Sequence, residues 1–152
     1  MFNRIKEKTL IIYYDFHFAF YDIWICIREF AENVPILGLD LKDDQIKDFI
    51  ASVRTLEIRI CNEWITNIAN VSKYFTDNEI KEMYTMYSDL VKIEEILKRP
   101  VETVENSEWN NLYKLMNNYM YEISGEHYER VGIMVIQKVF DICNKLRKVG
   151  RF

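Results

Sequence analysis

Three carboxylates recur at intervals of seven residues through the most apolar stretch of the chain. They are Asp15, Asp22 and Glu29, and the stretch runs from Thr9 to Phe30. Because seven residues make almost two turns of an α-helix, the three acids would form one narrow acidic stripe on a helix. Nearly all of the remaining helix surface would be apolar, so it must be covered on most sides, by its own chain or by another copy. This pattern constrains architecture and association, and it names no reaction.

An extended strand is the alternative for the same stretch, since β-branched and aromatic residues are abundant and alternate locally with smaller ones. Two observations favour a helix. No Gly, Pro or Asn interrupts residues 9–32, which is far longer than a usual strand of about 5–6 residues. A period of two would also place the acids on both faces of a sheet. The sequence therefore predicts a first helix over residues 3–32, ending before Pro35.

The whole chain is predicted to be one all-α domain, residues 1–152. Apolar residues make up 49% of its 152 residues, and it holds only four Gly and two Pro, which favours long helices over a β-sandwich. Apolar stripes and helix-end signals, including the capping box Thr76-Asp-Asn-Glu79, predict four further helices. They cover about residues 44–75, 76–98, 107–125 and 126–148. Short connections favour an antiparallel bundle of about five helices.

Charge and cysteine content narrow the possible partners and the compartment. The chain is acidic, with a net charge of −4 and a pI near 5.3, which argues against nucleic-acid binding. Cys26, Cys61 and Cys143 are odd in number, far apart and outside any C-x-x-C pair. Reduced, buried thiols in a cytoplasmic protein are therefore expected, in place of disulfides or a metal site.

The apolar stretch also has the length of a membrane span, and basic residues precede it as in a secretory signal. However, Asp15, His17 and Asp22 interrupt the stretch, and three such side chains within a bilayer are costly. No small-residue cleavage site follows the first apolar run. The prediction is that the protein has no membrane partner.

The motifs of common enzyme classes are missing from the sequence. None of the four glycines belongs to a phosphate-binding loop, and no G-x-G occurs. The two histidines, His17 and His127, are interpreted as a buried structural residue and a surface residue. No Glu-x-x-His motif exists for a di-iron bundle. No catalytic residue, cofactor or metal ligand is assigned, and a non-enzymatic protein is favoured.

Carboxylate pairs three residues apart give the main enzymatic alternative. All-α nucleotide pyrophosphohydrolases bind magnesium through such pairs, and Glu79, Glu82, Glu102 and Glu105 are the candidates here. These pairs fall at or before predicted helix starts, where the helix dipole and capping already favour acids, so this plainer interpretation is preferred. A third possibility is a small-molecule binder with a pocket lined by Trp24, Trp64 and Trp109, although tryptophans usually pack in the core.

The acidic stripe (Asp15, Asp22 and Glu29) has three interpretations: a solvated helix edge, a docking strip for a basic partner, or an inward-facing metal site that lacks a histidine. The surplus of apolar helix surface favours a protein that works by binding protein, of the inhibitor, immunity-protein or regulatory-adaptor type. A homo-oligomer, such as a homodimer, is also predicted. The identity of the partner, the oligomeric state and the biological process do not follow from the sequence.

Overall fold

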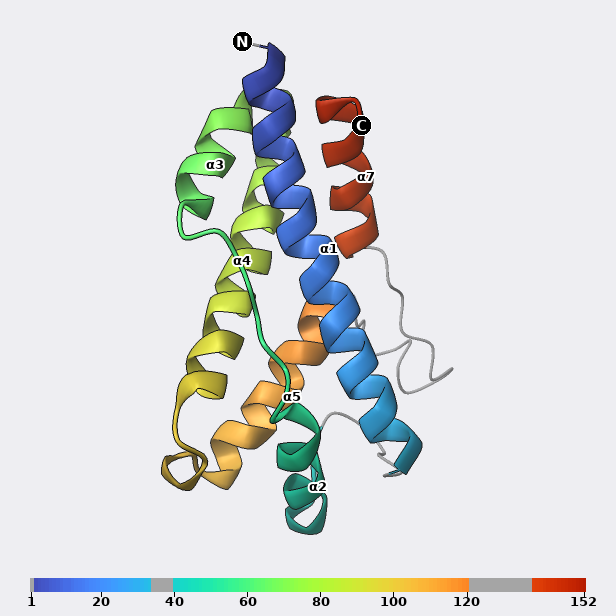
Figure 1. The fold of residues 1–152 in the computed structure, drawn as a ribbon, viewed down its shortest axis with the longest axis vertical. Helices are drawn as coiled ribbons and strands as arrows, with labels where there is room; N and C mark the ends of the chain where they lie inside the picture. The colour runs from blue at the N-terminus through green and yellow to red at the C-terminus, as the bar shows by residue number, and fades with distance from the viewer. Residues whose placement is uncertain (1, 34–39, 121–137) are drawn as a thin grey trace.

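The apolar stretch folds as the long helix that the spacing of the acids predicted. This helix, α1, spans Phe2–Asn33 in a computed structural model that describes residues 2–33, 40–120 and 138–152 (Figure 1). One side of α1 supplies a row of fully or nearly buried side chains to the core. These are Ile12, Phe16, Ala19, Phe20, Ile23, Cys26, Ile27 and Phe30.

The described residues form an all-α fold, with six α-helices where about five were predicted. After α1 the chain forms α2 (Asp43–Val53), α3 (Trp64–Val71), α4 (Asp77–Lys98), α5 (Asn106–Met120) and α7 (Lys138–Gly150). Two short 3-10 turns, Ser72–Tyr74 and Val101–Thr103, precede α4 and α5. The last predicted helix, residues 126–148, lies partly outside the described residues. His127 lies wholly outside them.

The prediction of one continuous helix over residues 44–75 is wrong. The helix stops at Val53 and starts again at Trp64, and residues 54–63 between them form a connecting segment with little regular structure. In this segment Ile58 is buried, whereas its neighbours Glu57 and Arg59 are exposed. This alternation is the pattern of an extended chain lying on a core, in which successive side chains point to opposite sides.

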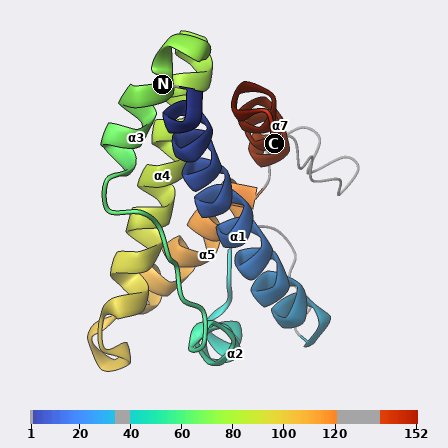
Figure 2. The ribbon, with the colours of Figure 1, turned by 45° about the horizontal axis from the view of Figure 1, so that its top comes forward.

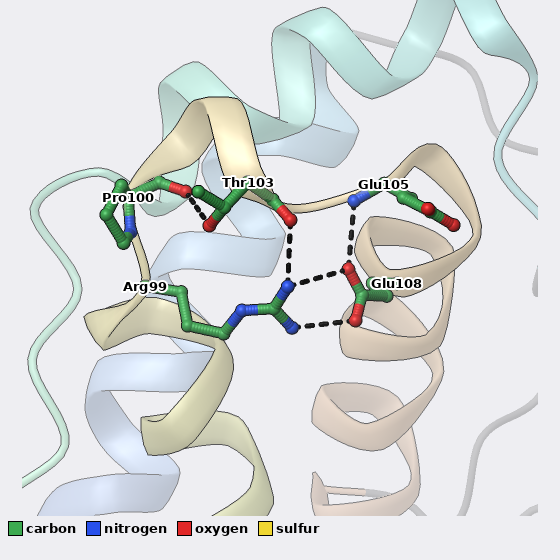
Figure 3. A network of polar contacts seen from close by, with 5 residues as sticks. All are labelled: Arg99, Pro100, Thr103, Glu105 and Glu108. Carbon is green, nitrogen blue, oxygen red and sulfur yellow. Dashed lines mark hydrogen bonds and ion pairs between the residues drawn. The ribbon is translucent and has the colours of Figure 1, made fainter.

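Local capping signals fix the ends of α4 as predicted. The backbone N–H of Glu79 donates to the Thr76 hydroxyl at 3.2 Å, and the Thr76 N–H donates to the Glu79 carboxylate at 2.8 Å, so the capping box is formed. At the other end, Arg99 makes a bidentate ion pair with Glu108 of α5 and also donates to the carbonyl of Thr103 (Figure 3). These contacts join the end of α4 to the start of α5, and the two helices also pack against each other.

Helix α1 is the central element of the bundle. It packs against α7 and α3 most extensively and also contacts α2, α4 and α5. Helix α7 runs antiparallel to α1, because Phe140 in its first turn packs on Phe20 while Phe152, two residues after its end, packs on Tyr13. Both termini therefore lie at the same end of the molecule (Figure 1).

By length and composition alone, α1 is also the one described helix that could cross a membrane, over Arg4–Glu32. Core helices of proteins with no membrane role pass the same test when much of their surface is apolar. Here the apolar surface is divided between two sides of α1, of which one forms the core described above. The other side defines the candidate site.

Candidate functional site

Asp15, the first member of the acidic stripe, is hydrogen-bonded to two other elements of the fold. Its Oδ2 atom accepts a 2.7 Å hydrogen bond from the Tyr87 hydroxyl of α4 and a 3.1 Å bond from the backbone N–H of Cys61. Burial raises the pKa of the Asp15 carboxyl above its ordinary value, and these two hydrogen bonds oppose that rise. Asp15 therefore joins α1, α4 and the connecting segment at one point.

A groove follows the acidic stripe along α1. It has a volume of about 440 Å³ and lies between α1 on one side and the end of α2 with the connecting segment on the other. All three stripe acids line it, together with Ala19 and Cys26, which occupy the same helix face between them. The seven-residue spacing therefore places the three acids in a row along one wall of the groove.

The electrostatic character of the groove is negative. Four carboxylates line it, namely those of Asp15, Asp22, Glu29 and Glu57, against one guanidinium, that of Arg59. Arg59 is ion-paired with Glu57 at 2.9 Å, and the nearby charge of Asp22 also favours its protonated form. Because Asp22 and Glu29 are exposed, a cation entering the groove would meet them without displacing core contacts.

An exposed apolar row runs beside the stripe, on the side of α1 that faces away from the core. Tyr14, Phe18 and Tyr21 are 44%, 55% and 53% exposed, and Ile25 next to them is partly buried. The rings of Tyr14 and Phe18 stack with centroids 5.3 Å apart. We call these four residues the α1 seam. Figures 1 and 2 show α1 in front of α4 and α5, with α3 and α7 to either side of it.

The α1 seam was not predicted from the sequence. All the apolar residues of the first helix were expected to be covered, with no distinction between its two sides. A signal was present: Tyr14, Phe18, Tyr21 and Ile25 are spaced by four, three and four residues, and Tyr14 and Tyr21 directly precede stripe acids. Such spacing places apolar residues in one row on a helix, with the acids along its edge.

The carboxylate pairs of the enzymatic alternative do not converge. Glu79 belongs to the first turn of α4, and Glu102 and Glu105 follow its last turn. About 16 residues of helix, from Glu82 to the end of α4 at Lys98 and roughly 24 Å long at 1.5 Å per residue, separate the two pairs, so one metal ion cannot bridge them. Among the described residues, no group of three or more His, Cys, Asp or Glu side chains is placed to hold a metal ion.

The tryptophans and the described histidine also occupy separate, structural positions. Trp109 is buried, Trp64 stacks on Tyr87 with centroids 4.8 Å apart, and Trp24 lies under the guanidinium of Arg28. They do not form one pocket. His17, expected to be buried, is only partly so, and it stacks on Tyr13 at 5.3 Å.

A second hollow, of about 330 Å³, lies at the end of the molecule where the termini meet. Its lining includes the cationic side chains of Lys6, Lys73 and Arg151, which come from three separate parts of the chain. The described part of the chain thus carries positive charge at this end and negative charge along the groove of α1.

Comparisons of the chain with protein families, with characterised proteins and with solved structures find no match. The class of protein is therefore argued from its surface alone. Its described features are an all-α bundle, a negatively charged groove and an exposed apolar seam on the central helix.

Proposed function

We propose that the protein acts by binding another protein through the α1 seam and the adjoining groove, and that it performs no reaction of its own. Inhibitors, immunity proteins and regulatory adaptors work in this way. The observation that supports the proposal is the exposure of Tyr14, Phe18 and Tyr21, each by about half, in one row on the most central helix. Contiguous exposed apolar surface bordered by polar groups is typical of interaction sites.

The composition of the surface also fits a protein interface. Tyrosine and phenylalanine are enriched at the centres of interfaces, where they supply large contact areas, and charged groups are found at the rim. Here aromatic rings form the row and Asp22 and Glu29 lie along one edge. None of the three exposed rings belongs to the described core.

A site-specific crosslinking experiment tests this function. A photoreactive phenylalanine analogue is placed at position 18, and the same analogue at position 65 is the control, because Phe18 and Ile65 are both 55% exposed. In lysate of the source cells, position 18 should give a discrete crosslinked product that position 65 does not give. The product should also disappear when Asp22→Lys and Glu29→Lys are introduced together. Equal products from both positions would contradict the proposal.

The predicted homo-oligomer and the predicted cytoplasmic location are separate expectations. Sedimentation of the purified protein over a range of micromolar concentrations tests self-association directly. The proposal above does not require it, because the seam can bind a different chain while the protein remains a monomer.

A further inference from the structure

We infer that the partner presents an α-helix to the seam, and that this helix belongs to a different protein and carries Lys or Arg along one flank. This inference rests on the proposed function and adds to it the chemistry of the partner. It follows from the register of α1, from the sign of the charge on its exposed edge and from the effect of that charge on self-pairing.

The exposed side of α1 has the register of a helix-pairing surface. If Phe18 and Ile25 are taken as a positions of a heptad, Tyr14 and Tyr21 are d positions. The buried residues Ala19, Phe20 and Ile23 then fall at b, c and f, which accounts for the core lying on the opposite side. From Tyr14 to Ile25 the seam extends about 16 Å along the helix axis, which a partner helix of roughly three turns can cover.

The acidic stripe occupies the e positions of the same register. Asp15 and Asp22 each follow a d residue, and Glu29 follows Arg28 at the next d position. Residues at e and g positions pair across the edges of packed helices and determine which helices associate. Since Asp22 and Glu29 are exposed and the lining of the groove beside them is net negative, the matching flank of the partner must be positive.

This face is poorly suited to pairing with a second copy of itself. In an antiparallel pair centred on the seam, e positions meet e positions, so Asp15 of one copy would meet Asp22 of the other, whereas Lys8, also at an e position, would meet Glu29. In a parallel pair, e positions meet g positions, and the g residues here are Leu10, His17, Trp24 and Ala31, with no Lys or Arg among them. Parallel pairing thus places no Lys or Arg opposite the acids, and antiparallel pairing leaves Asp15 facing Asp22, whereas a basic helix from another protein supplies cations along the whole flank.

A designed peptide provides a direct binding test. The probe is a labelled 21-residue helical peptide with Leu at its a and d positions and Lys at its e and g positions. Fluorescence anisotropy should show saturable binding that weakens about tenfold or more between 50 and 300 mM salt, because exposed ion pairs are screened. A matched peptide with Glu in place of each Lys should bind at least tenfold more weakly. Equal binding of the two peptides would overturn the inference.

Protein variants locate the binding. Asp22→Lys with Glu29→Lys should weaken binding of the Lys peptide at least tenfold, whereas Glu95→Lys with Glu102→Lys, the same charge change at exposed positions of α4 and the turn after it, should change it less than twofold. Phe18→Ala with Tyr21→Ala should also weaken binding, while the circular dichroism and the unfolding midpoint stay close to wild type. If the two charge variants have the same effect, the peptide is attracted only by net charge, and the inference fails.

The remaining outcomes separate this inference from the proposed function. If the Lys peptide does not bind but position 18 still crosslinks specifically, the protein-binding function stands and the basic helix is wrong. If Phe18→Ala with Tyr21→Ala abolishes a concentration-dependent dimer in sedimentation, the seam binds a second copy, and the inference of a different protein is wrong. If the same variant abolishes binding to neutral phosphatidylcholine vesicles and the peptide does not compete, the seam is a membrane surface, and both proposals fail.

Discussion

The hydroxyl of Tyr87 donates a 2.7 Å hydrogen bond to the carboxylate of Asp15, which fastens the middle of α1 to the middle of α4. The same carboxylate oxygen accepts the N–H of Cys61 from the connecting segment. Tyr87 is fully buried, and burial together with the charge of Asp15 raises the pKa of its phenol well above the ordinary value. The hydroxyl therefore keeps its proton at neutral pH and remains a donor to Asp15.

The first prediction concerns the pH dependence of stability. Because burial raises the pKa of Asp15 above 3.8, the folded protein holds this proton at pH values where the unfolded chain has lost it. Over that window, a rise in pH favours the unfolded chain, so the contribution of Asp15 to stability falls. Asp15→Asn retains an oxygen that can accept both hydrogen bonds and has no charge to desolvate. Its stability relative to wild type should therefore increase as the pH rises from about 4 to 7, measured by urea unfolding.

Two further variants separate charge from hydrogen bonding at this position. Asp15→Ala leaves the buried Tyr87 hydroxyl and the Cys61 N–H without their acceptor, which should cost about 2–4 kcal/mol of unfolding free energy. Tyr87→Phe removes a hydrogen bond that lowers the pKa of Asp15, so the dependence on pH should become steeper than in wild type. A stability difference between Asp15→Asn and wild type that does not vary with pH would show that Asp15 titrates normally.

The second prediction tests the connecting segment, where the helix prediction was wrong. Ile58 is 5% exposed although it lies outside any helix, and Ile65 is 55% exposed although it lies in α3. Ile58→Ala should therefore destabilise the protein by about 2–4 kcal/mol through loss of buried methyl groups. Ile65→Ala, the matched control, should change stability by no more than about 0.5 kcal/mol. If the two variants lose similar stability, the segment does not pack as described.

Sequence signals predicted a helix well where the residues that determine it lie close together in the chain. The uninterrupted stretch of α1 and the Thr76–Glu79 capping box are examples, since the residues that determine them lie within a few turns. The connecting segment carried two competing patterns. Leu56, Ile60 and Trp64 fit a helical stripe, whereas Leu56, Ile58 and Ile60 alternate with charged residues as in an extended chain. The bond from Cys61 to Asp15, 46 residues away in sequence, fastens the extended form, and no local pattern contains that information.

The sequence predicted the row of acids in the candidate site but not the roles of its members. Spacing alone placed the three acids on one side of a helix, and the structure places them along one groove. Spacing could not show that Asp15 is used inside the fold while Asp22 and Glu29 face solvent, because that difference depends on Tyr87 and Cys61. Nor could it show which apolar side of α1 remains exposed. That depends on where α3, α7 and the connecting segment pack, which is a property of the whole bundle.

The third prediction concerns the three cysteines. Burial, with a smaller contribution from the charge of Glu29, raises the pKa of the Cys26 thiol to about 11, and burial raises that of Cys143 to about 12. At pH 8 both thiols are therefore almost entirely protonated, and the thiolate is the reactive form. Cys61 is only partly buried. A short iodoacetamide pulse on the folded protein should therefore label Cys61 first, as read by mass spectrometry of its peptides, and all three cysteines should react in urea.

Glu29→Gln provides the decisive comparison, because it removes the negative charge near Cys26 while keeping a side chain of similar size. The pKa of Cys26 should fall, and its alkylation should become faster relative to that of Cys143. Cys143 serves as an internal control, because the pKa of its thiol is raised by burial and not by the charge of Glu29. Faster labelling of both cysteines together would indicate general loosening of the fold instead. An unchanged ratio of the two rates would mean that the charge of Glu29 does not affect the Cys26 thiol.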